Sequence, residues 1–375
     1  MNILKKEKIP LKELIGGAQH FLYKYTITGS SGGPKVYIQA SLHGGELQGN
    51  AVILSLMEDL KHLPFKGSVI FIPLSNPYAT NNKLGKYTFG RFNPNTGDNW
   101  NRNFIDLISS KKINLTGFCR RYLKESEATI REKFQDFLSK EFKKLEIQLQ
   151  SNNELHDNNK LNLILQKASC SADIILDLHT GPSATEYLYC ATRSIDEAQH
   201  LHFKHVLEVD HEFAGAMDEA TFMPWVHLEE TFERLGRKIS FNFHSFTLEL
   251  ESEEGFSLSM ARMQKDKILN YFKYKKIIPG KSSPKPYIKE HLSNYITIFS
   301  PHSGLIDYQV DLGKSFKKGD ILGTIYQFHN LEKTDSTKYQ LPVIAAFDGI
   351  LINKCPSSAI QQGMELFQVM KKSNN

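Results

Sequence analysis

Five short apolar segments, separated by longer amphipathic ones, constrain the fold of this chain more than any other feature. They are rich in β-branched and large apolar residues and are bounded by Gly, Pro, Asn or Ser, a pattern that predicts strands. The segments span residues 35–42, 68–74, 173–178, 187–191 and 246–250. Several are apolar at nearly every position, which is typical of a sheet with helices on both faces.

The segments between these strands include two with helical spacing. One apolar stripe runs from Leu47 to Leu60, and another lies among many charges within residues 127–149. A polar stretch over residues 151–160 predicts a loop before a further helix, which leads into the strand at residue 173. This alternation predicts the α/β class, with a three-layer α/β/α sandwich around a mixed sheet.

A change in composition divides the chain near residues 279–286. The stretch IIPGKSSPKP combines Pro, Gly, Ser and Lys as linkers do, so we expect domains over residues 1–280 and 287–375. The second domain consists of short strands and glycine turns in two similar units, which suggests a small β-barrel or sandwich of the biotinyl/lipoyl-carrier type. Such carriers modify a lysine in a tight hairpin, but residues 329–340 form a long polar stretch here. Lys333 and Lys338 have no carrier motif around them, so we expect no covalent cofactor.

Composition argues against several classes of function. The net charge of +5 comes from 46 basic and 41 acidic residues that are mixed along the chain, so we expect no nucleic-acid partner. No uninterrupted apolar run approaches the roughly 20 residues of a membrane span, and the opening residues carry Lys and Glu where a secretory signal is apolar. The four cysteines form no CxxC pair, which fits a reducing compartment. We therefore expect a cytoplasmic protein with no membrane partner.

The HGGE motif of His43 to Glu46 is the first candidate metal-binding feature. The HxxE spacing by itself indicates little, because the sequence contains it four times. Only this pair follows a predicted buried strand and encloses two glycines, which allow the backbone to turn. Glu46 also opens a predicted helix, whose N-terminus favours a negative charge. The other pairs are expected to be helical or loop residues without metal: His205/Glu208, His227/Glu230 and His329/Glu332.

Two later predicted strands carry the other polar residues of this candidate site. His179 ends the strand ADIILDL, at the edge where α/β proteins bind ligands. Asp177, on the same strand face, is placed either to orient an imidazole or to pair with a nearby donor. Glu249 lies in the apolar SFTLELES, where a buried acid needs a purpose, and Glu251 on the same face is its competitor. Two imidazoles and one carboxylate fill three zinc positions and leave the fourth for water, while a spare carboxylate moves protons.

The stretch GRFNPNTGDNWNRNF, over residues 90–104, brings two arginines between the first candidate ligands and His179. Its many turn formers are typical of a solvated loop. A guanidinium can also stabilise a carbonyl oxygen as it becomes negative, or grip a substrate carboxylate with its planar fork. Arg91 and Arg102 are therefore candidates for either role.

Four short motifs together resemble the succinylglutamate desuccinylase/aspartoacylase family of the zinc carboxypeptidase superfamily. They are HGGE, the NRNF of residues 101–104, the DLH of residues 177–179 and the TLEL around Glu249. The resemblance implies one zinc ion per chain and assigns the site residues as follows: His43, Glu46 and His179 as zinc ligands, Glu249 as general base, Arg91 as carbonyl polariser, and Asn101 and Arg102 as binders of a substrate carboxylate. Ile105 replaces a proline that the family often has, and the helical stretch 106–170 is longer than in compact members, so the substrate stays open.

The expected function is zinc-dependent hydrolysis of an amide bond in a small carboxylate-bearing substrate of the N-acyl amino acid type. Metal-activated water would be the nucleophile, with Glu249 as the general base. A zinc carboxypeptidase that acts on peptides would use the same residues. A non-catalytic binding protein is the third reading, in which the site holds metal and the C-terminal β-domain docks a partner.

Overall fold

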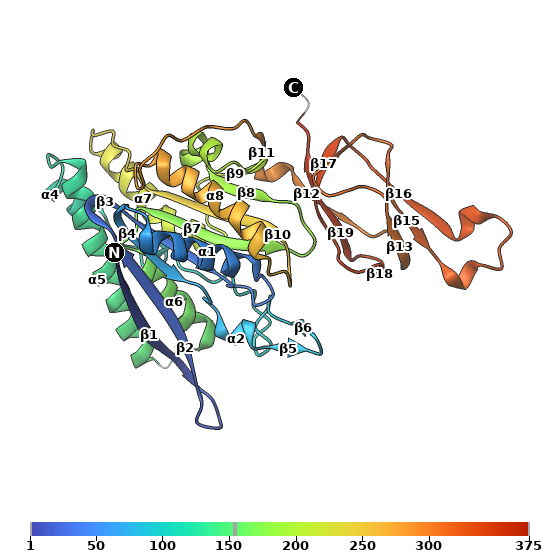
Figure 1. Cartoon of the computed structure of the whole chain (residues 1–375), viewed down its shortest axis with the longest axis horizontal. Coiled ribbons are helices and arrows are strands. Elements are labelled where there is room, and N and C mark those ends of the chain that lie inside the picture. The colour runs from blue at the N-terminus through green and yellow to red at the C-terminus, as the bar shows by residue number, and fades with distance from the viewer. Residues whose placement is uncertain (1, 153–155, 374–375) are drawn as a thin grey trace.

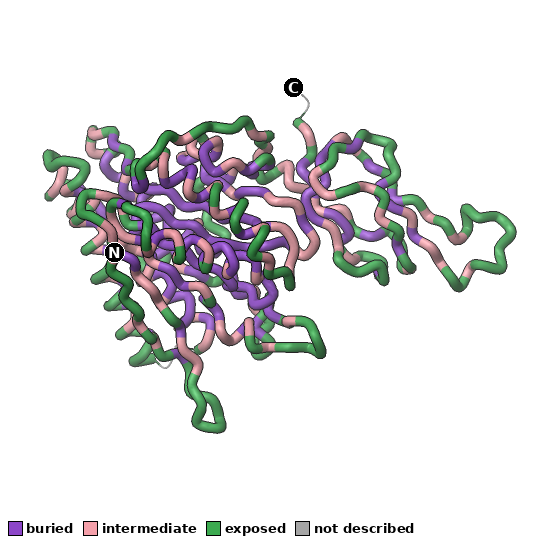
Figure 2. Tube along the Cα trace, viewed as in Figure 1, coloured by how far each residue is buried: buried purple, intermediate pink, exposed green. Residues whose placement is uncertain are grey.

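The chain forms a large α/β body with a smaller all-β domain at one end (Figure 1). The computed structural model describes residues 2–152 and 156–373. Figure 2 shows that buried segments run through the middle of the large body, while its rim and the outer loops of the small domain are exposed. No helix in the described part of the chain is long and apolar enough to cross a membrane. All four cysteines are free.

A mixed sheet of nine strands forms the centre of the large body. Its central strands β4, β3, β7 and β10 run parallel to one another, whereas β1, β2 and β8 introduce antiparallel pairs. In spatial order the strands are β1 (Ile3–Glu13), β2 (Gln19–Thr28), β4 (Lys66–Ile72), β3 (Ser30–Ala40), β7 (Ile174–Gly181), β10 (His244–Ser252), β8 (Tyr187–Ala191), β9 (His205–Val209) and β11 (Ile288–His291).

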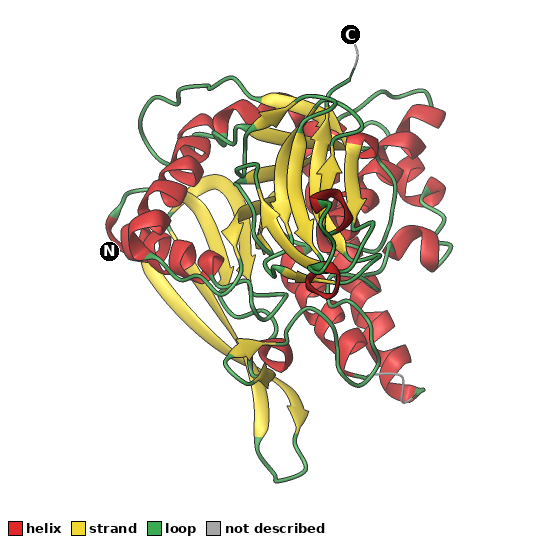
Figure 3. Cartoon of the chain, turned by 90° about the vertical axis from the view of Figure 1, so that its right-hand side faces the viewer, coloured by secondary structure: helices red, strands yellow, loops and turns green. Residues whose placement is uncertain are grey.

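Helices cover both faces of this sheet (Figure 3). On one face, α1 (Gln48–His62) and α8 (Leu258–Tyr274) pack on apolar residues of β3, β7 and β10. On the other face, α5 (Glu127–Ser151), α6 (Asp157–Ser169) and α7 (Met217–Arg234) form a second core. This three-layer arrangement confirms the predicted α/β/α sandwich. The loop predicted over residues 151–160 includes 153–155, which lie outside the described residues, and α6 already begins at Asp157.

Shorter elements lie in the connections. They are α2 (Pro77–Thr80), the hairpin of β5 (Lys83–Leu84) and β6 (Tyr87–Thr88), α3 (Leu107–Ser110), α4 (Thr116–Arg121) and the 3₁₀ helix Thr192–His200. The segment after β4 that contains α2, β5 and β6 leads into the loop of residues 90–104, at the end of the sheet where β3 and β7 stop.

The small domain consists of two antiparallel sheets of four strands. One contains β12 (Tyr295–Phe299), β19 (Glu365–Lys371), β17 (Gly349–Lys354) and β14 (Ser315–Phe316). The other contains β16 (Gln340–Ile344), β15 (Ile321–Tyr326), β13 (Gly304–Tyr308) and β18 (Ala359–Ile360). Apolar residues of both sheets share one core, as in the small β-sandwich that the sequence predicts. The linker strand β11 pairs with β9 of the large sheet, so the two small sheets begin at β12.

Candidate metal centre and its pocket

One face of the central strands carries polar side chains above an otherwise apolar sheet. Asp177 and His179 of β7 lie beside Thr247 and Glu249 of β10, and Glu249 in turn lies beside Tyr187 of β8. The intervening residues on these strands, including Leu176, Leu178 and Leu248, belong to the core under α1 and α8. Because side chains alternate between the faces of a strand, a single register places all these polar groups on one side.

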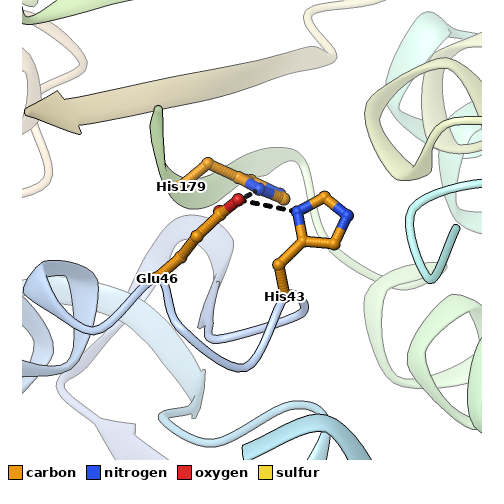
Figure 4. Close-up of side chains that lie close together, drawn as sticks. All are labelled: His43, Glu46 and His179. Atoms are coloured by element: carbon orange, nitrogen blue, oxygen red, sulfur yellow. Dashed lines mark hydrogen bonds and ion pairs between the residues drawn. The ribbon is translucent and has the colours of Figure 1, made fainter. Parts of the chain in front are cut away.

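The three residues expected to bind zinc converge on one point (Figure 4). Nδ1 of His43 lies 2.7 Å from Oε1 of Glu46, and Nδ1 of His179 lies 2.7 Å from Oε2 of the same carboxylate. The ligand atoms of this trio all lie within 4.8 Å of one another, and the three side chains are buried. Two imidazole nitrogens and a carboxylate form the donor set of a catalytic zinc site, so these residues fit such an ion.

The outer nitrogen of each imidazole is held by a side chain from another segment. Oδ2 of Asp177 lies 3.0 Å from Nε2 of His179, and Gln39 donates to the other oxygen of Asp177 at 2.9 Å. Oδ1 of Asn99 lies 2.8 Å from Nε2 of His43. These contacts fix both rings with Nδ1 towards Glu46. The sequence indicated that Asp177 could orient an imidazole, but it gave no signal for Asn99, which lies in the loop of residues 90–104.

Electrostatics in the trio favour a charged carboxylate between the two rings. Burial by itself would raise the pKa of Glu46, but His43 and His179 outweigh it and hold this pKa well below its usual value. Burial lowers the pKa of His43 despite the neighbouring Glu46. For His179 burial acts in the same direction, but Asp177 and Glu46 reverse it and raise the pKa. A metal ion would replace the proton of His179.

The first glycine of HGGE, Gly44, is required for close packing rather than for an unusual backbone conformation. A Cβ on Gly44 would lie 2.4 Å from the backbone of Ala79, and the N–H of Gly44 donates to the carbonyl of Gly90 at 3.0 Å. Neither Gly44 nor Gly45 has a positive φ. The motif therefore tucks the turn with His43 against α2 and against the start of the loop of residues 90–104.

Glu249 lies in the same pocket and is only 8% exposed. Burial, followed by the nearby charge of Glu46, raises its pKa to about 8, although His179 and Arg91 act in the opposite direction. Its Oε2 has no hydrogen-bond partner among the described residues. A carboxyl group of this kind exchanges protons near neutral pH, which is what a general base or acid requires.

The expectation that Glu251 shares the face of Glu249 is wrong. The register of β10 against β7 shifts between Glu249 and Ser252, and Glu251 has a φ of 73°. This irregularity breaks the alternation of side chains. The charged neighbours of Glu251 are Glu186 and Lys267 rather than the metal ligands, so it is not a competitor for the role of base.

The loop of residues 90–104 brings its arginines to the same pocket. Nη1 of Arg91 lies 3.1 Å from Oε1 of Glu46 and 3.6 Å from Oε1 of Glu253, and its side chain is 43% exposed. Asn101 is buried and accepts a hydrogen bond from the backbone N–H of Met217, at the start of α7. Arg102 is exposed, lines the pocket and donates one hydrogen bond to the carbonyl of Asn101.

The pocket around these groups has a volume of about 220 Å³. Besides the predicted residues, it is lined by side chains that sequence reasoning missed, among them Asn99, Tyr189, Asp218, Glu219 and Leu292. A larger cavity of about 520 Å³ lies elsewhere, beside Lys66, Lys273 and Lys276, and includes no cluster of metal-ligating side chains. The chemistry therefore points to the smaller pocket.

The other HxxE pairs belong to ordinary secondary structure and its connections. His227 and Glu230 lie in α7, and His329 lies in a 3₁₀ turn, Phe328–Asn330. His205 and Glu208 lie in strand β9, so the expectation of a helix or loop there is wrong. Within the described ranges, only His43, Glu46 and His179 form a potential metal cluster of three or more such residues.

Comparisons with known proteins identify the class to which this fold and site belong. The succinylglutamate desuccinylase/aspartoacylase catalytic domain matches residues 32–273, more than half of the 375 residues. The chain therefore belongs to this family of hydrolases, as the motifs predicted. No match was found among curated proteins.

Several solved structures are similar over nearly the whole chain. A succinylglutamate desuccinylase/aspartoacylase family protein from Shewanella amazonensis SB2B is 33% identical, with 98% of both chains covered and a TM-score of 0.91. A similar protein from Shewanella frigidimarina NCIMB 400 is 32% identical, with 99% of this chain and 98% of that chain covered and a TM-score of 0.92. An ectoine utilization protein from Ruegeria pomeroyi, solved with bound product, shares the fold at 15% identity over 98% of this chain and 94% of that chain, with a TM-score of 0.63.

Proposed function

We propose that this protein is a zinc-dependent hydrolase that cleaves an amide bond in a small carboxylate-bearing substrate of the N-acyl amino acid type. The observation that carries the proposal is the convergence of two imidazoles and Glu46, with the buried Glu249 in the same pocket. Membership of the desuccinylase/aspartoacylase family supports this reaction class.

His43, Glu46 and His179 would hold one zinc ion, with Asp177 and Asn99 orienting the two rings. Zinc in such a site polarises a carbonyl group and lowers the pKa of water to about 7. Its positive charge would also lower the pKa of Glu249 from the raised value of the metal-free site.

Glu249 would take a proton from water while the water oxygen bonds to the carbonyl carbon. The same carboxyl group then delivers that proton to the amine as the C–N bond breaks. Arg91 is held beside Glu46, where its guanidinium can donate to the carbonyl oxygen as negative charge develops there. The contacts of Arg91 with Glu46 and Glu253 keep the guanidinium in place before substrate arrives.

Arg102 and Asn101 would recognise the carboxylate of the substrate. A guanidinium has five N–H donors, and Arg102 uses one nitrogen on the carbonyl of Asn101, so further donors are available to a ligand. The Oδ1 of Asn101 accepts from Met217, which fixes the amide and leaves its NH₂ group as the donor for a substrate. The small pocket fits a short acyl amino acid.

The test is the release of amine from N-acetyl, N-succinyl and N-formyl amino acids by zinc-loaded protein, compared with the release of C-terminal residues from short peptides. We expect turnover of N-acyl amino acids and its loss in Glu249→Gln. Faster cleavage of peptides would make the protein a carboxypeptidase that uses the same residues. Absence of hydrolysis across both panels would reject the proposed activity in favour of a metal-holding binding protein.

A further inference from the structure

Asp218 is an acidic residue of the pocket that the proposed reaction does not use. It is the second residue of α7 and lines the same pocket as His43, Glu46 and Glu249. The 3.0 Å hydrogen bond from Met217, the residue before Asp218, to Asn101 connects the start of this helix to the loop of residues 90–104. Asp218 therefore faces the space that a substrate would fill.

Apart from Glu249, to which the proposed reaction assigns a role, the other acidic groups around this space already have partners. Glu46 contacts both imidazoles, and Asp177 contacts His179. Glu253 lies 3.6 Å from Arg91. Glu219, next to Asp218, accepts hydrogen bonds from the N–H groups of Ala214 and Ala216, at 2.7 and 3.1 Å, and so caps α7.

Asp218, in contrast, contacts only neutral donors. Its Oδ1 accepts from the backbone N–H of Glu219 at 2.9 Å, and the side chain of Thr247 is a second donor. Its charged neighbours, Glu219 and Asp177, are both acidic. In the described part of the chain, no Lys, Arg or His forms an ion pair with Asp218.

A partly buried carboxylate without a cation is costly in free energy. Burial and the two acidic neighbours raise the pKa of Asp218 to about 6, so the group is still largely ionised at neutral pH. The N-terminus of α7 offsets part of this cost. A positively charged group in the pocket would offset more of it. Arg91 and Arg102, the arginines that line the pocket, contact Glu46, Glu253 and the carbonyl of Asn101.

We propose that Asp218 binds an ammonium group of the substrate, so that the preferred substrate is an N-acylated diamino acid. Arg102 would hold the carboxylate of this substrate, and the trio and Glu249 would act on its amide. Asp218 would hold its free amine. The reaction in this assignment rests on the proposed amide hydrolysis, whereas the binding of the ammonium group does not. Asp218 is then a specificity-determining residue.

A purely structural role for Asp218 predicts a different result. Acidic residues in the first turn stabilise a helix through its dipole. If this were the whole role of Asp218, Asp218→Asn would lower the melting temperature but would change the handling of charged and neutral substrates equally. The ratio between two matched substrates therefore separates the two roles.

The experiment compares N-acetyl-ornithine with N-acetyl-norleucine, in which a methyl group replaces the ammonium group, and N-acetyl-lysine with N-acetyl-2-aminoheptanoate. We measure kcat/KM for the parent, Asp218→Asn and the control Glu212→Gln, an exposed acid six residues earlier. In the parent and the control, kcat/KM should be about tenfold or more higher for the amine-bearing member of at least one pair than for its methyl analogue. Asp218→Asn should bring this ratio close to one. An equal preference in Asp218→Asn and the parent, or none in the parent, overturns the proposal.

Binding separates a failure of this proposal from a failure of the proposed function. The same pairs are titrated by calorimetry into zinc-loaded Glu249→Gln, with and without Asp218→Asn. If no compound is hydrolysed but the amines bind more tightly through Asp218, the hydrolase function fails and the ammonium site stands. If the compounds are hydrolysed and both members of each pair bind equally, the ammonium site is wrong and the hydrolase function stands.

Discussion

At the scale of single residues, the candidate metal centre depends on contacts that lie outside the trio. Asp177 and Asn99 lie at the outer nitrogens of His179 and His43, and these contacts favour the ring orientations in which each Nδ1 faces Glu46. Partners of this kind typically contribute 10–100-fold to metal affinity. The structure therefore separates the residues that would bind a metal ion from those that would orient its ligands.

We expect His43→Ala and His179→Ala to lose zinc, because each removes one of three ligands. Asn99→Ala should retain the site but weaken zinc affinity by about 10–100-fold, since its carbonyl orients His43. Chelator competition measures these affinities. The matched controls are His227→Ala and the exposed Asn95→Ala, which should bind zinc as the parent does. Full zinc occupancy in His43→Ala would remove it from the ligand set.

We expect Glu249→Gln to retain the fold and zinc but to lower kcat by about 100-fold or more, because it removes the group that transfers the proton. Glu251→Gln should have little effect, since the irregular end of β10 turns Glu251 towards Lys267. Steady-state kinetics on the preferred N-acyl amino acid checks both variants. A larger loss of kcat in Glu251→Gln than in Glu249→Gln would show that Glu249 is not the base.

The sequence was sufficient to bring the trio and Glu249 together as candidates, because each lies in or shortly after an apolar strand, where a polar residue is unusual. It was not sufficient for Asn99 or Asp218. Asn99 lies in a loop of turn formers with no periodicity, and Asp218 resembles any acid at the start of a helix. Only the tertiary fold brings them to the pocket.

At the scale of secondary-structure elements, apolar periodicity predicted the buried face of α5 but not that of α1, where Leu54 of the predicted stripe is 46% exposed. The helix predicted over residues 127–149 is α5, which begins after Ser126 because the side chain of Ser126 accepts the N–H of Thr129. Strands β1 and β2 had no comparable signal. Nearly every residue of β1 is exposed or only partly buried, so its sequence lacks the apolar face by which strands are recognised.

One contact between two helices should make stability depend on pH. Nε2 of His227 in α7 lies 2.8 Å from Oδ2 of Asp106, which caps α3. The bond to Asp106 raises the pKa of His227 more than burial lowers it. Burial would raise the pKa of Asp106, but its bonds to His227 and Ser109 lower it overall. His227, which belongs to one of the other HxxE pairs, thus forms a tether with Asp106 between α3 and α7.

The directions of these two pKa shifts define the pH range in which the contact stabilises the fold. The raised pKa of His227 stabilises the fold fully below its usual 6.5, and this contribution is lost as pH rises through the folded-state pKa. The lowered pKa of Asp106 contributes above its usual 3.8 and is lost as pH falls through the folded-state value. Between about pH 5.5 and 8.5 the parent should therefore lose about 1 kcal/mol more stability than His227→Gln. Urea unfolding at both pH values measures this, and an identical loss in the two proteins would exclude the tether.

At the scale of the whole molecule, the small domain is attached through a segment next to the candidate metal centre. The backbone of residues 183–185, between β7 and β8, pairs with β17: Thr185 donates to Ile352 at 3.0 Å, and Lys354 donates to Ser183 at 2.9 Å. A Cβ on Gly181 would lie 2.1 Å from Oδ1 of Asn353. The sequence predicted a linker near residues 279–286 but could not predict this docking, because it depends on segments that lie about 170 residues apart.

Asn353 is the buried polar group at this junction. Its amide nitrogen lies 3.1 Å from the hydroxyl of Tyr187, 2.8 Å from that of Tyr295 and 3.0 Å from Oε1 of Gln368. Tyr187 belongs to β8 of the large sheet and pairs with Glu249 of the neighbouring strand β10. The amide therefore links the small domain to the strand that is next to the candidate base.

We expect Asn353→Leu, which has a similar volume but no donor, to lower the free energy of unfolding by about 1–3 kcal/mol, because buried hydroxyl groups lose their partner. Both tryptophans, Trp100 and Trp225, are buried in the large body, so their fluorescence reports its unfolding alone. If the two domains form one cooperative unit, this substitution in the small domain shifts the tryptophan transition in urea, and the exposed Gln361→Leu does not. An unchanged tryptophan transition, with an earlier loss of β-structure by circular dichroism, would show instead that the small domain unfolds independently.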